Sequence, residues 1–169
     1  KNTYNPNYEG TKIGPANVLK DVYEDSSKVK FMSAVAHKDK IAQVKVIATE
    51  DIFSRILNEM EDRHINMDMI NFFTEKKAFA LDVSNLEEVE NILKQYDIEY
   101  EIKPDCAKVT LIGNKVTETP GVIAKIMRAL NAENVTLLQS SDSYNSLSCL
   151  VDEKDMVTTV HVIHNAFSV

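Results

Sequence analysis

A loop bounded by two glycines holds the residues of this 169-residue chain that are best suited to chemistry. It runs from Gly113 to Gly121, between a strand-like apolar segment and a predicted helix. Threonine is a favoured helix N-cap and proline is favoured in the first turn, so Thr119, followed by Pro120, is predicted to cap this helix. Free backbone N–H groups and the helix dipole favour an anion at such an end. We therefore expect this loop to bind the carboxylate of a small ligand such as an amino acid.

Polar side chains near this helix end suit the rest of such a ligand. Lys115 can add positive charge. Asn114, Thr117 and Glu118 offer oxygen atoms that can bind an ammonium or a hydroxyl group. The run Gln139–Ser143 consists of five polar residues and is a second candidate wall of the site. Two alternatives need no ligand: a capped helix after an ordinary loop, and a solvated connection at the polar run.

The sequence contains no recognisable catalytic or metal motif. It lacks a P-loop, a dinucleotide-binding GxGxxG, a GxSxG nucleophile turn and an HExxH zinc motif. His161 and His164 have the i,i+3 spacing of two ligands on one helix face, but no cysteine or carboxylate completes a site. Cys106 and Cys149 lie in apolar segments without metal or disulfide spacing. We therefore expect no metal, and two reduced core cysteines typical of a cytoplasmic protein.

Composition argues against several classes of protein. The formal net charge is −7, whereas a nucleic-acid partner needs a basic face. The chain is 44% hydrophobic and 27% charged, as in soluble globular proteins. No apolar run approaches the ~20 residues that span a bilayer, and no signal-peptide pattern opens the chain. The first residue is Lys1 and not methionine, so we expect a fragment of a longer protein.

One order of elements is predicted twice along the chain. In the first copy it comprises a strand at residues 41–47, a helix capped by Thr49, strands at 65–73 and 78–83, a helix with a Ser84–Glu87 capping box, and a strand at 98–103 that ends at Pro104. The second copy comprises a strand at 106–112, the helix after the glycine-bounded loop, a second strand in which Val135 and Leu137 match Ile65 and Met67, and a strand at 147–151. It ends in a helix at 153–167 with Met156, Val157, Val160, Ile163, His164 and Phe167 facing inward. This internal duplication predicts two similar units.

The two copies differ by one insertion. Residues 106–112 repeat residues 41–47 at an offset of 65 positions. Ile126, Met127 and Leu130 of the next helix repeat Ile56, Leu57 and Met60 at an offset of 70. The five extra residues lie in the glycine-bounded loop, because the first copy makes the same connection through residues 48–50 without glycine or proline. An insertion confined to one copy favours a ligand site at this loop.

The repeat predicts an α+β fold of two ferredoxin-like units packed side by side. Each unit has the order βαββαβ, with a four-stranded antiparallel sheet and two helices on one face. Residues 41–104 form the first unit. Residues 28–40 join residues 105–169 in the second, because that copy lacks a last strand and the strand-like segment 29–36 can supply it. Residues 1–27 form a lead-in segment, and each small unit needs a packing partner or dimerisation.

Several segments carry a resemblance to a known family. The unit VTLIGNKVTETPGVIAKIMRAL, in its duplicated setting, resembles the ACT domain, a regulatory module that binds small molecules. The segments YNPNYEGTKI, MSAVAHKDKIAQVKV, HINMDMINFF and SLSCLVDEKDMVTTVHVIHNAF resemble the C-terminal regulatory region of bacterial aspartokinases. The run LQSSDS is similar to the diaminopimelate-sensitive isozymes of the Bacillus type.

The resemblance implies a regulatory fragment without the kinase domain. ATP and Mg would bind that missing domain, which transfers a phosphoryl group to the side-chain carboxylate of aspartate, so this chain is expected to be no enzyme and to hold no cofactor. An end-product amino acid (lysine, threonine or meso-diaminopimelate) would bind here for feedback control of the aspartate pathway, which includes lysine biosynthesis. The resemblance also implies a homodimer through the ACT domains. The alternatives are a dimerisation scaffold whose ligand site has decayed and an ACT fragment of another enzyme of amino-acid metabolism.

Carried over by position, the resemblance also implies the effector contacts. They are Asn114, Lys115, Val116, Thr117, Glu118, Thr119, Pro120, Gly121, Val122 and Ile123 of the loop, Gln139, Ser140, Ser141 and Asp142 of the polar run, and Met67, Asp68, Met69 and Asn71 of the first copy. The first copy lacks the Pro-Gly loop, so one site per chain is expected. Lys115, Glu118 and Asp142 suit a ligand with an extra charged end, such as lysine or diaminopimelate, without excluding threonine.

Overall fold

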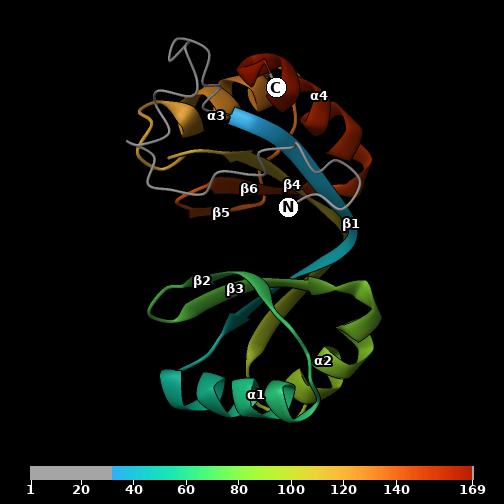
Figure 1. Ribbon diagram of the computed structural model, residues 1–169. Helices are drawn as coiled ribbons and strands as arrows, with labels where there is room; N and C mark the ends of the chain where they lie inside the picture. The colour runs from blue at the N-terminus through green and yellow to red at the C-terminus, as the bar shows by residue number, and fades with distance from the viewer. Residues whose placement is uncertain (1–31, 169) are drawn as a thin grey trace, which may run out of the picture. The chain divides into compact units, whose positions relative to one another are not determined.

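Six strands and four α-helices follow one another in residues 32–168, the part of the chain that the computed structural model describes (Figure 1). They are β1 (Met32–Ile47), α1 (Glu50–Asp62), β2 (Asp68–Phe72), β3 (Lys76–Asp82), α2 (Leu86–Leu93), β4 (Glu99–Gly113), α3 (Val122–Ala132), β5 (Gln139–Ser143), β6 (Ser146–Asp152) and α4 (Met156–Phe167). Short 3-10 turns, Val83–Asn85 and Glu153–Asp155, precede α2 and α4. The predicted lead-in at residues 1–27 and the start of the strand predicted at 29–36 lie outside the described residues.

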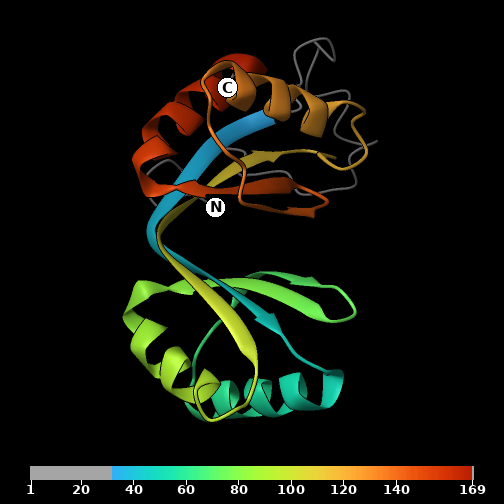
Figure 2. The ribbon, with the colours of Figure 1, turned by 180° about the vertical axis from the view of Figure 1, so that it is seen from behind.

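Two long antiparallel strands, β1 and β4, run through both repeats (Figures 1 and 2). All six strands form one antiparallel sheet in the order β2-β3-β1-β4-β6-β5. Residues 41–47 of β1 and 99–103 of β4 make a four-stranded half with β3 and β2. Residues 32–38 of β1 and 106–113 of β4 make the other half with β6 and β5. Each half has the ferredoxin-like strand order, and we call the halves with their helices the first unit and the second unit.

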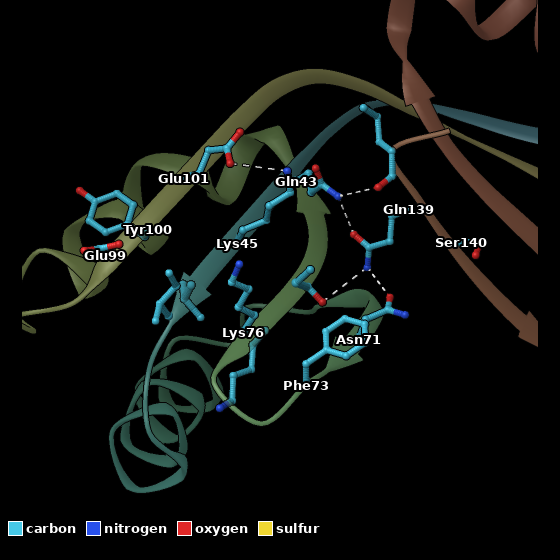
Figure 3. Close-up of a pocket in the computed structure, with 15 residues that line it drawn as sticks. Gln43, Lys45, Asn71, Phe73, Lys76, Glu99, Tyr100, Glu101, Gln139 and Ser140 are labelled. Carbon is cyan, nitrogen blue, oxygen red and sulfur yellow. Dashed lines mark hydrogen bonds and ion pairs between the residues drawn. The ribbon is translucent and has the colours of Figure 1, made fainter. Parts of the chain in front are cut away.

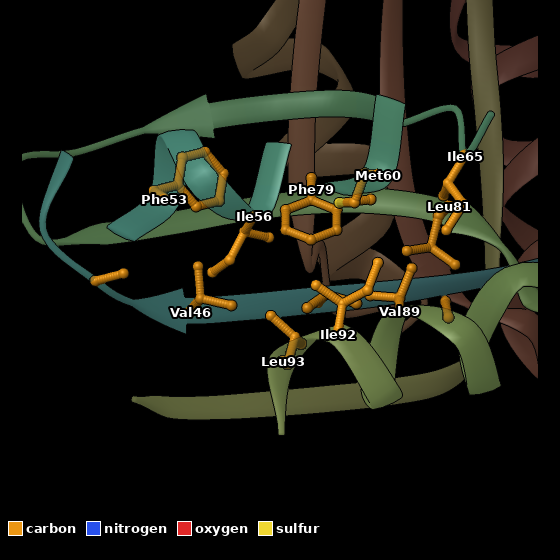
Figure 4. Close-up of a cluster of buried hydrophobic side chains, with 13 residues drawn as sticks. Val46, Phe53, Ile56, Met60, Ile65, Phe79, Leu81, Val89, Ile92 and Leu93 are labelled. Atoms are coloured by element: carbon orange, nitrogen blue, oxygen red, sulfur yellow. The ribbon is translucent and has the colours of Figure 1, made fainter. Parts of the chain in front are cut away.

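Each unit has its own hydrophobic core between its sheet and its two helices. In the first unit, alternate residues of β1 (Ala42, Val44 and Val46) belong to one buried cluster with residues of α1 and α2. Figure 4 shows Val46 beside Ile56 of α1 and Leu93 of α2. In the second unit, Val109 and Leu111 of β4 face α3 and α4 in the same way. The period of two on the strands and the apolar stripes on the helices therefore produce both cores.

A third, smaller cluster joins the strand faces that carry no helix. It contains Ile41, Met69 and Ala80 from the first unit and Cys106 and Leu150 from the second. Because successive strand residues point to opposite faces, these side chains lie on the other face from the two main cores. The two units therefore contact one another through apolar side chains as well as through β1 and β4.

The sequence predicted that strand β4 would end at Pro104. The strand instead continues through Pro104. Proline lacks an N–H donor, so it interrupts a strand only where the ladder needs that donor. The pairing of β1 with β4 shifts register at this point, between Lys38 and Ile41, and neither Pro104 nor Asp105 is paired. Lys40 and Asp105 take left-handed backbone conformations, with φ of 54° and 56°. The proline thus lies in a bulge between the two units.

The predicted capping box of α2 is wrong. The carboxylate of Asp82 accepts hydrogen bonds from the backbone N–H of Ser84 at 3.0 Å and from its hydroxyl at 2.7 Å. Ser84 therefore lies inside a 3-10 turn and caps nothing, and α2 begins at Leu86 without a side-chain cap. An aspartate two residues before the expected cap thus binds the N–H and hydroxyl groups of Ser84 itself.

Two further elements are shorter than predicted. Strand β2 covers Asp68–Phe72, so residues 65–67 and residue 73 of the predicted strand are not part of it. Helix α4 begins at Met156 and not at residue 153, because Glu153–Asp155 forms a 3-10 turn. Val157 and His164, predicted to face inward, are exposed, and Thr159 is buried in their place. The hydroxyl of Thr159 donates to the backbone carbonyl of Asp155 at 2.8 Å, which allows a polar side chain to be buried there.

Candidate functional site

The glycine-bounded loop between β4 and α3 is folded by its own backbone. The N–H of Val116 donates to the carbonyl of Tyr144 at 2.8 Å, and the N–H of Glu118 donates to the carbonyl of Lys115 at 3.1 Å. The hydroxyl of Thr119 donates to the Lys115 carbonyl at 2.8 Å. Thr119 is therefore not the N-cap of α3, contrary to the prediction. Its side chain closes the turn that precedes the helix.

Gly121 is the residue from which α3 starts, in a left-handed conformation with φ of 84°. No side chain caps α3, whereas the hydroxyl of Thr49 caps α1 of the first unit by accepting from the N–H of Ile52. The first N–H groups of any α-helix have no partner within the helix. Among the described residues, no side chain therefore bonds to the first N–H groups of α3, whereas Thr49 bonds to one of those of α1.

A cavity of about 370 Å³ lies at the start of α3. It is lined by Val116, Thr117, Thr119, Pro120, Gly121, Val122 and Ile123 of the loop and helix, by Ser140 and Asp142 of β5, and by Leu147 of β6. The loop and the polar strand, predicted to form the two walls of one site, thus meet at this cavity. We call it the loop cavity.

The charges at the loop cavity differ from those expected. Lys115 and Glu118 form an ion pair with each other at 3.3 Å, and neither lines the cavity. The pKa of Lys115 is raised because the Glu118 carboxylate accepts a hydrogen bond from its ammonium group. Asp142 is the one charged residue among the lining residues of the described chain. The loop cavity therefore combines a helix start, which suits a carboxylate, with a carboxylate on β5, which suits an ammonium group.

A second cavity, of about 520 Å³, lies on the helix-free face of the first unit (Figure 3). It is lined by Gln43, Lys45, Val46 and Ile47 of β1, by Asn71, Phe73, Lys76, Lys77 and Ala78 on and around β2 and β3, by Glu99, Tyr100 and Glu101 of β4, and by Leu138, Gln139 and Ser140. This cavity as a whole was not predicted from the sequence. The polar residues at alternate positions of β1 were the one feature of the sequence that could have indicated this cavity.

A buried amide network forms one end of this second cavity (Figure 3). The side-chain N–H of Gln43 donates to the side-chain oxygen of Gln139 at 2.9 Å, and that of Gln139 donates to the side-chain oxygen of Asn71 at 2.6 Å and to the backbone carbonyl of Met69. Carbonyls can only accept, which sets the direction of both glutamine amides. As a result, the side-chain oxygen of Gln43 is buried without a partner among the described residues.

The remaining predicted contacts lie away from the loop cavity. Asp68 forms an ion pair with Lys108, and Met69 is buried in the third cluster. Asn71 and Gln139 belong to the amide network, which joins this part of the first copy to the first residue of β5. Met67 packs against the core of the first unit. Asn114 and Ser141 line neither cavity, and Leu147, which the prediction missed, lines the loop cavity at the position that repeats Lys77.

The described histidines and cysteines do not form a metal site. His161 and His164 are exposed on α4, and no group of metal-ligating side chains gathers anywhere in residues 32–168. Cys106 and Cys149 are free and buried, as predicted. Burial raises the pKa of Cys149 to about 12, so its thiol stays protonated. Among the described residues, no helix has the length and hydropathy to cross a bilayer.

The strand order and the two helices on one face of each half define two ferredoxin-like units in tandem, with a cavity at one helix start. Residues 101–165 match the family model of the ACT domain. The chain is 27% identical to aspartokinase 1 of Bacillus subtilis, over 99% of this chain and 40% of that protein. It therefore spans about two fifths of the length of this curated relative.

Two solved structures have the same fold. The aspartokinase alpha and beta subunits align with a TM-score of 0.75 and 26% identity, over 82% of this chain and 99% of that one. The regulatory subunit of aspartate kinase from Thermus thermophilus aligns with a TM-score of 0.73 and 23% identity, again over 82% and 99%. The chain is therefore similar to the regulatory part of these aspartokinases, and its residues 101–165 match the ACT domain.

Proposed function

We propose that the loop cavity binds a free amino acid as an allosteric effector of an aspartokinase. The amino acid's carboxylate would accept hydrogen bonds from the open N–H groups of Val122 and Ile123 at the start of α3. Its ammonium group would pair with Asp142 on β5. The side chain would lie against Val116 and Leu147, which are both buried. Lysine, threonine and meso-diaminopimelate are the candidate effectors.

One observation carries this proposal: the two units treat the start of the equivalent helix differently. In the first unit Thr49 caps α1. In the second unit the loop of Gly113–Gly121 is five residues longer, ends in a left-handed glycine and leaves α3 uncapped beside a cavity. An added loop that leaves donors open suits ligand binding better than it suits helix stability. One effector site per chain follows.

The regulatory effect would come from a difference in affinity between two states. An effector shifts an equilibrium only as far as it binds one arrangement more tightly than the other. A coupling free energy of about 1–3 kcal/mol is typical and changes the population ratio roughly 5- to 150-fold. In the whole protein, that shift would control a kinase part that uses ATP and Mg to phosphorylate aspartate in the cytoplasm. This chain itself would hold no cofactor.

The organisation of the chain supports a second element of the proposal, a homodimer through the ACT units. Strands β2 and β5 are the two edges of the sheet. Edge strand β2 exposes Ile70 at 42% and Phe72 at 59%, and exposed apolar edges favour pairing with another chain. We place the first unit at residues 41–104 and the second at residues 28–40 with 105–169, a division supported by the two separate cores.

Calorimetric titration of the protein with lysine, threonine, methionine and meso-diaminopimelate tests the effector site. We expect one of them to bind with one site per chain, and Asp142→Asn to weaken that binding at least tenfold. Asp97→Asn is the matched control, because Asp97 is exposed in the first unit and lines neither cavity. Absence of heat from all four at millimolar concentration would exclude the effector site and leave the dimerisation scaffold.

A further inference from the structure

The two units can be compared atom by atom at the connection between strand and helix. In the first unit the N–H of Ala48 donates to the carbonyl of Glu75 at 3.0 Å. In the second unit the N–H of Gly113 donates to the carbonyl of Asn145 at 2.9 Å. The offsets of the repeat, 65 for the strand and 70 for the hairpin, relate these two bonds to one another. The connections are therefore equivalent up to the point where the inserted loop begins.

The strand register extends this equivalence to one pair of side chains. Val46 of β1 faces Lys77 of β3 in the first unit, and Leu111 of β4 faces Leu147 of β6 in the second. Lys77 and Leu147 thus hold the same position, next to the start of α1 and α3 respectively. Leu147 lines the loop cavity. Lys77 is wholly buried, at 1% exposure, and is among the largest fully buried side chains of the described residues.

The two units fill the space beside this position in different ways. In the second unit the inserted loop supplies Val116, which is 1% exposed and whose N–H donates to the carbonyl of Tyr144 at 2.8 Å. The first unit has no such loop. There the ammonium group of Lys77 donates to the carbonyl of Thr74, the equivalent of Tyr144, at 2.9 Å. One side chain thus takes over the hydrogen bond that the inserted loop makes.

The surroundings of the Lys77 ammonium group form a complete shell for a primary ammonium ion. Its nitrogen lies 2.7 Å from the carbonyl oxygen of Ala48, 2.9 Å from that of Thr74 and 3.1 Å from a carboxylate oxygen of Glu50. It also lies 5.9 Å from the centre of the Phe53 ring. A primary ammonium group has three N–H donors, and three oxygen atoms are present. The Glu50 side chain is 81% exposed, so this shell borders solvent on that side.

We propose that the first unit contains a binding niche for a primary ammonium ion, and that Lys77 is its resident occupant. The niche consists of the carbonyl oxygens of Ala48 and Thr74 and the carboxylate of Glu50. Its occupation closes the first unit's counterpart of the loop cavity. The ligand class is a primary alkylammonium ion, since three converging acceptors suit three N–H donors and no anion. The proposal concerns the first unit alone and does not rest on the effector site.

Chemical rescue tests this proposal. Lys77→Ala removes three carbons and the ammonium nitrogen, which together equal n-propylammonium. We expect the variant to melt at a lower temperature and to recover about 3–6 °C with n-propylammonium at ten times its Kd. Tetramethylammonium chloride, which has no N–H donor, should give no such recovery. The same melting response to both salts would overturn the proposal.

Two matched variants make the rescue specific. Lys77→Met fills the space without donors, so n-propylammonium should leave its melting temperature unchanged. Leu147→Ala opens the equivalent position in the second unit, where the Val116 N–H already bonds to the Tyr144 carbonyl. It should also show no rescue. An equal response of Lys77→Met and Lys77→Ala would contradict the niche.

The unmodified protein gives a test that does not depend on a folded variant. Reductive methylation of the native protein should modify Lys76, which is exposed and adjacent in sequence, and spare Lys77. After unfolding in urea both lysines should react. Mass spectrometry of the peptides measures each site. Equal modification of the two lysines in the native state would show that the Lys77 ammonium group is not held in the niche.

Discussion

The ammonium group of Lys108 on β4 pairs with the carboxylate of Asp68 on β2, and so links an inner strand of the second unit to the edge of the first. Gln43, which Lys108 repeats at the offset of 65, makes the reciprocal link from β1 to Gln139 on β5, at 2.9 Å. The two units are therefore joined by two related bridges, one charged and one neutral. The neutral bridge is the buried one.

Removing the neutral bridge should destabilise the protein more than removing the charged one. Gln139 is 8% exposed, and Gln139→Leu leaves Gln43 and the Met69 carbonyl without their partner. We expect a loss of about 1–3 kcal/mol in the free energy of unfolding. Asp68→Asn is the comparison, with an expected loss of at most about 1 kcal/mol, since its pair is partly exposed. Urea unfolding of both variants measures the difference, and equal losses would contradict it.

Gly121 should tolerate a side chain poorly because of its backbone, not its surroundings. Its φ is 84°, and a Cβ atom built there would meet nothing within 4 Å. We expect Gly121→Ala to lose about 1–2 kcal/mol of stability. Gly121→Asn should lose less, because asparagine visits this conformation more readily. Thermal unfolding compares them; an alanine variant as stable as the parent would mean that the loop relaxes.

The two threonines before α1 and α3 should respond differently to replacement by alanine. Thr49→Ala removes the side-chain cap of α1 and should cost about 0.5–2 kcal/mol. Thr119→Ala removes an exposed bond to the Lys115 carbonyl and caps no helix, so it should cost at most about 0.5–1 kcal/mol. Denaturant midpoints test the order. A larger loss of stability in Thr119→Ala than in Thr49→Ala would indicate that Thr119 caps α3.

Protonation of Asp82 should contribute to the loss of folding stability at low pH. Hydrogen bonds from the Ser84 side chain and backbone lower its pKa from 3.8 to about 2. A depressed folded-state pKa contributes stability that is present above the unfolded value and is lost as the pH falls through the folded value. The contribution of Asp82 should therefore disappear between about pH 4 and pH 2. NMR titration of its carboxyl carbon checks the pKa, and Ser84→Ala should raise it.

The cysteine thiols should be inert in the native protein. Burial raises the pKa of both, that of Cys149 to about 12, and the thiolate is the reactive form. We expect no modification of either by iodoacetamide at pH 8, and complete modification in urea. Mass spectrometry counts the adducts. Rapid labelling of Cys149 in the native state would mean that the core of the second unit opens.

The sequence predicted the features that depend on periodicity and failed at those that depend on competition between neighbours. The duplication allowed both helix pairs and the inserted loop to be located, because the apolar stripes and their offset do not depend on neighbouring side chains. Two helix caps were predicted wrongly. The hydroxyl of Ser84 donates to the carboxylate of Asp82 and does not cap α2. The hydroxyl of Thr119 donates to the Lys115 carbonyl and does not cap α3. Pro104 was read as a strand end because the bulge opposite it in β1 leaves no local signal.

The candidate site was predicted in part for the same reason. The loop and Ser140 to Asp142 were recognised as two walls because both are polar in one copy only. Leu147 was missed, since a leucine in a strand signals only core. The buried Lys77 was missed too, although its position is apolar in the other copy. The ion pair of Lys115 with Glu118 depends on side-chain geometry that spacing does not reveal.

The nesting of one unit inside the other has a consequence for how the chain folds. Residues 32–38 of β1 pair with residues 108–113 of β4, and the whole first unit lies between them in sequence. The last ladder of the second unit therefore closes a loop of some 70 residues, which is entropically slow unless the intervening chain is already compact. Folding of the first unit brings those two strand segments together at Ile41 and Cys106. We expect the first unit to fold before the second. Destabilising substitutions in the core of the first unit should therefore slow the folding of both units.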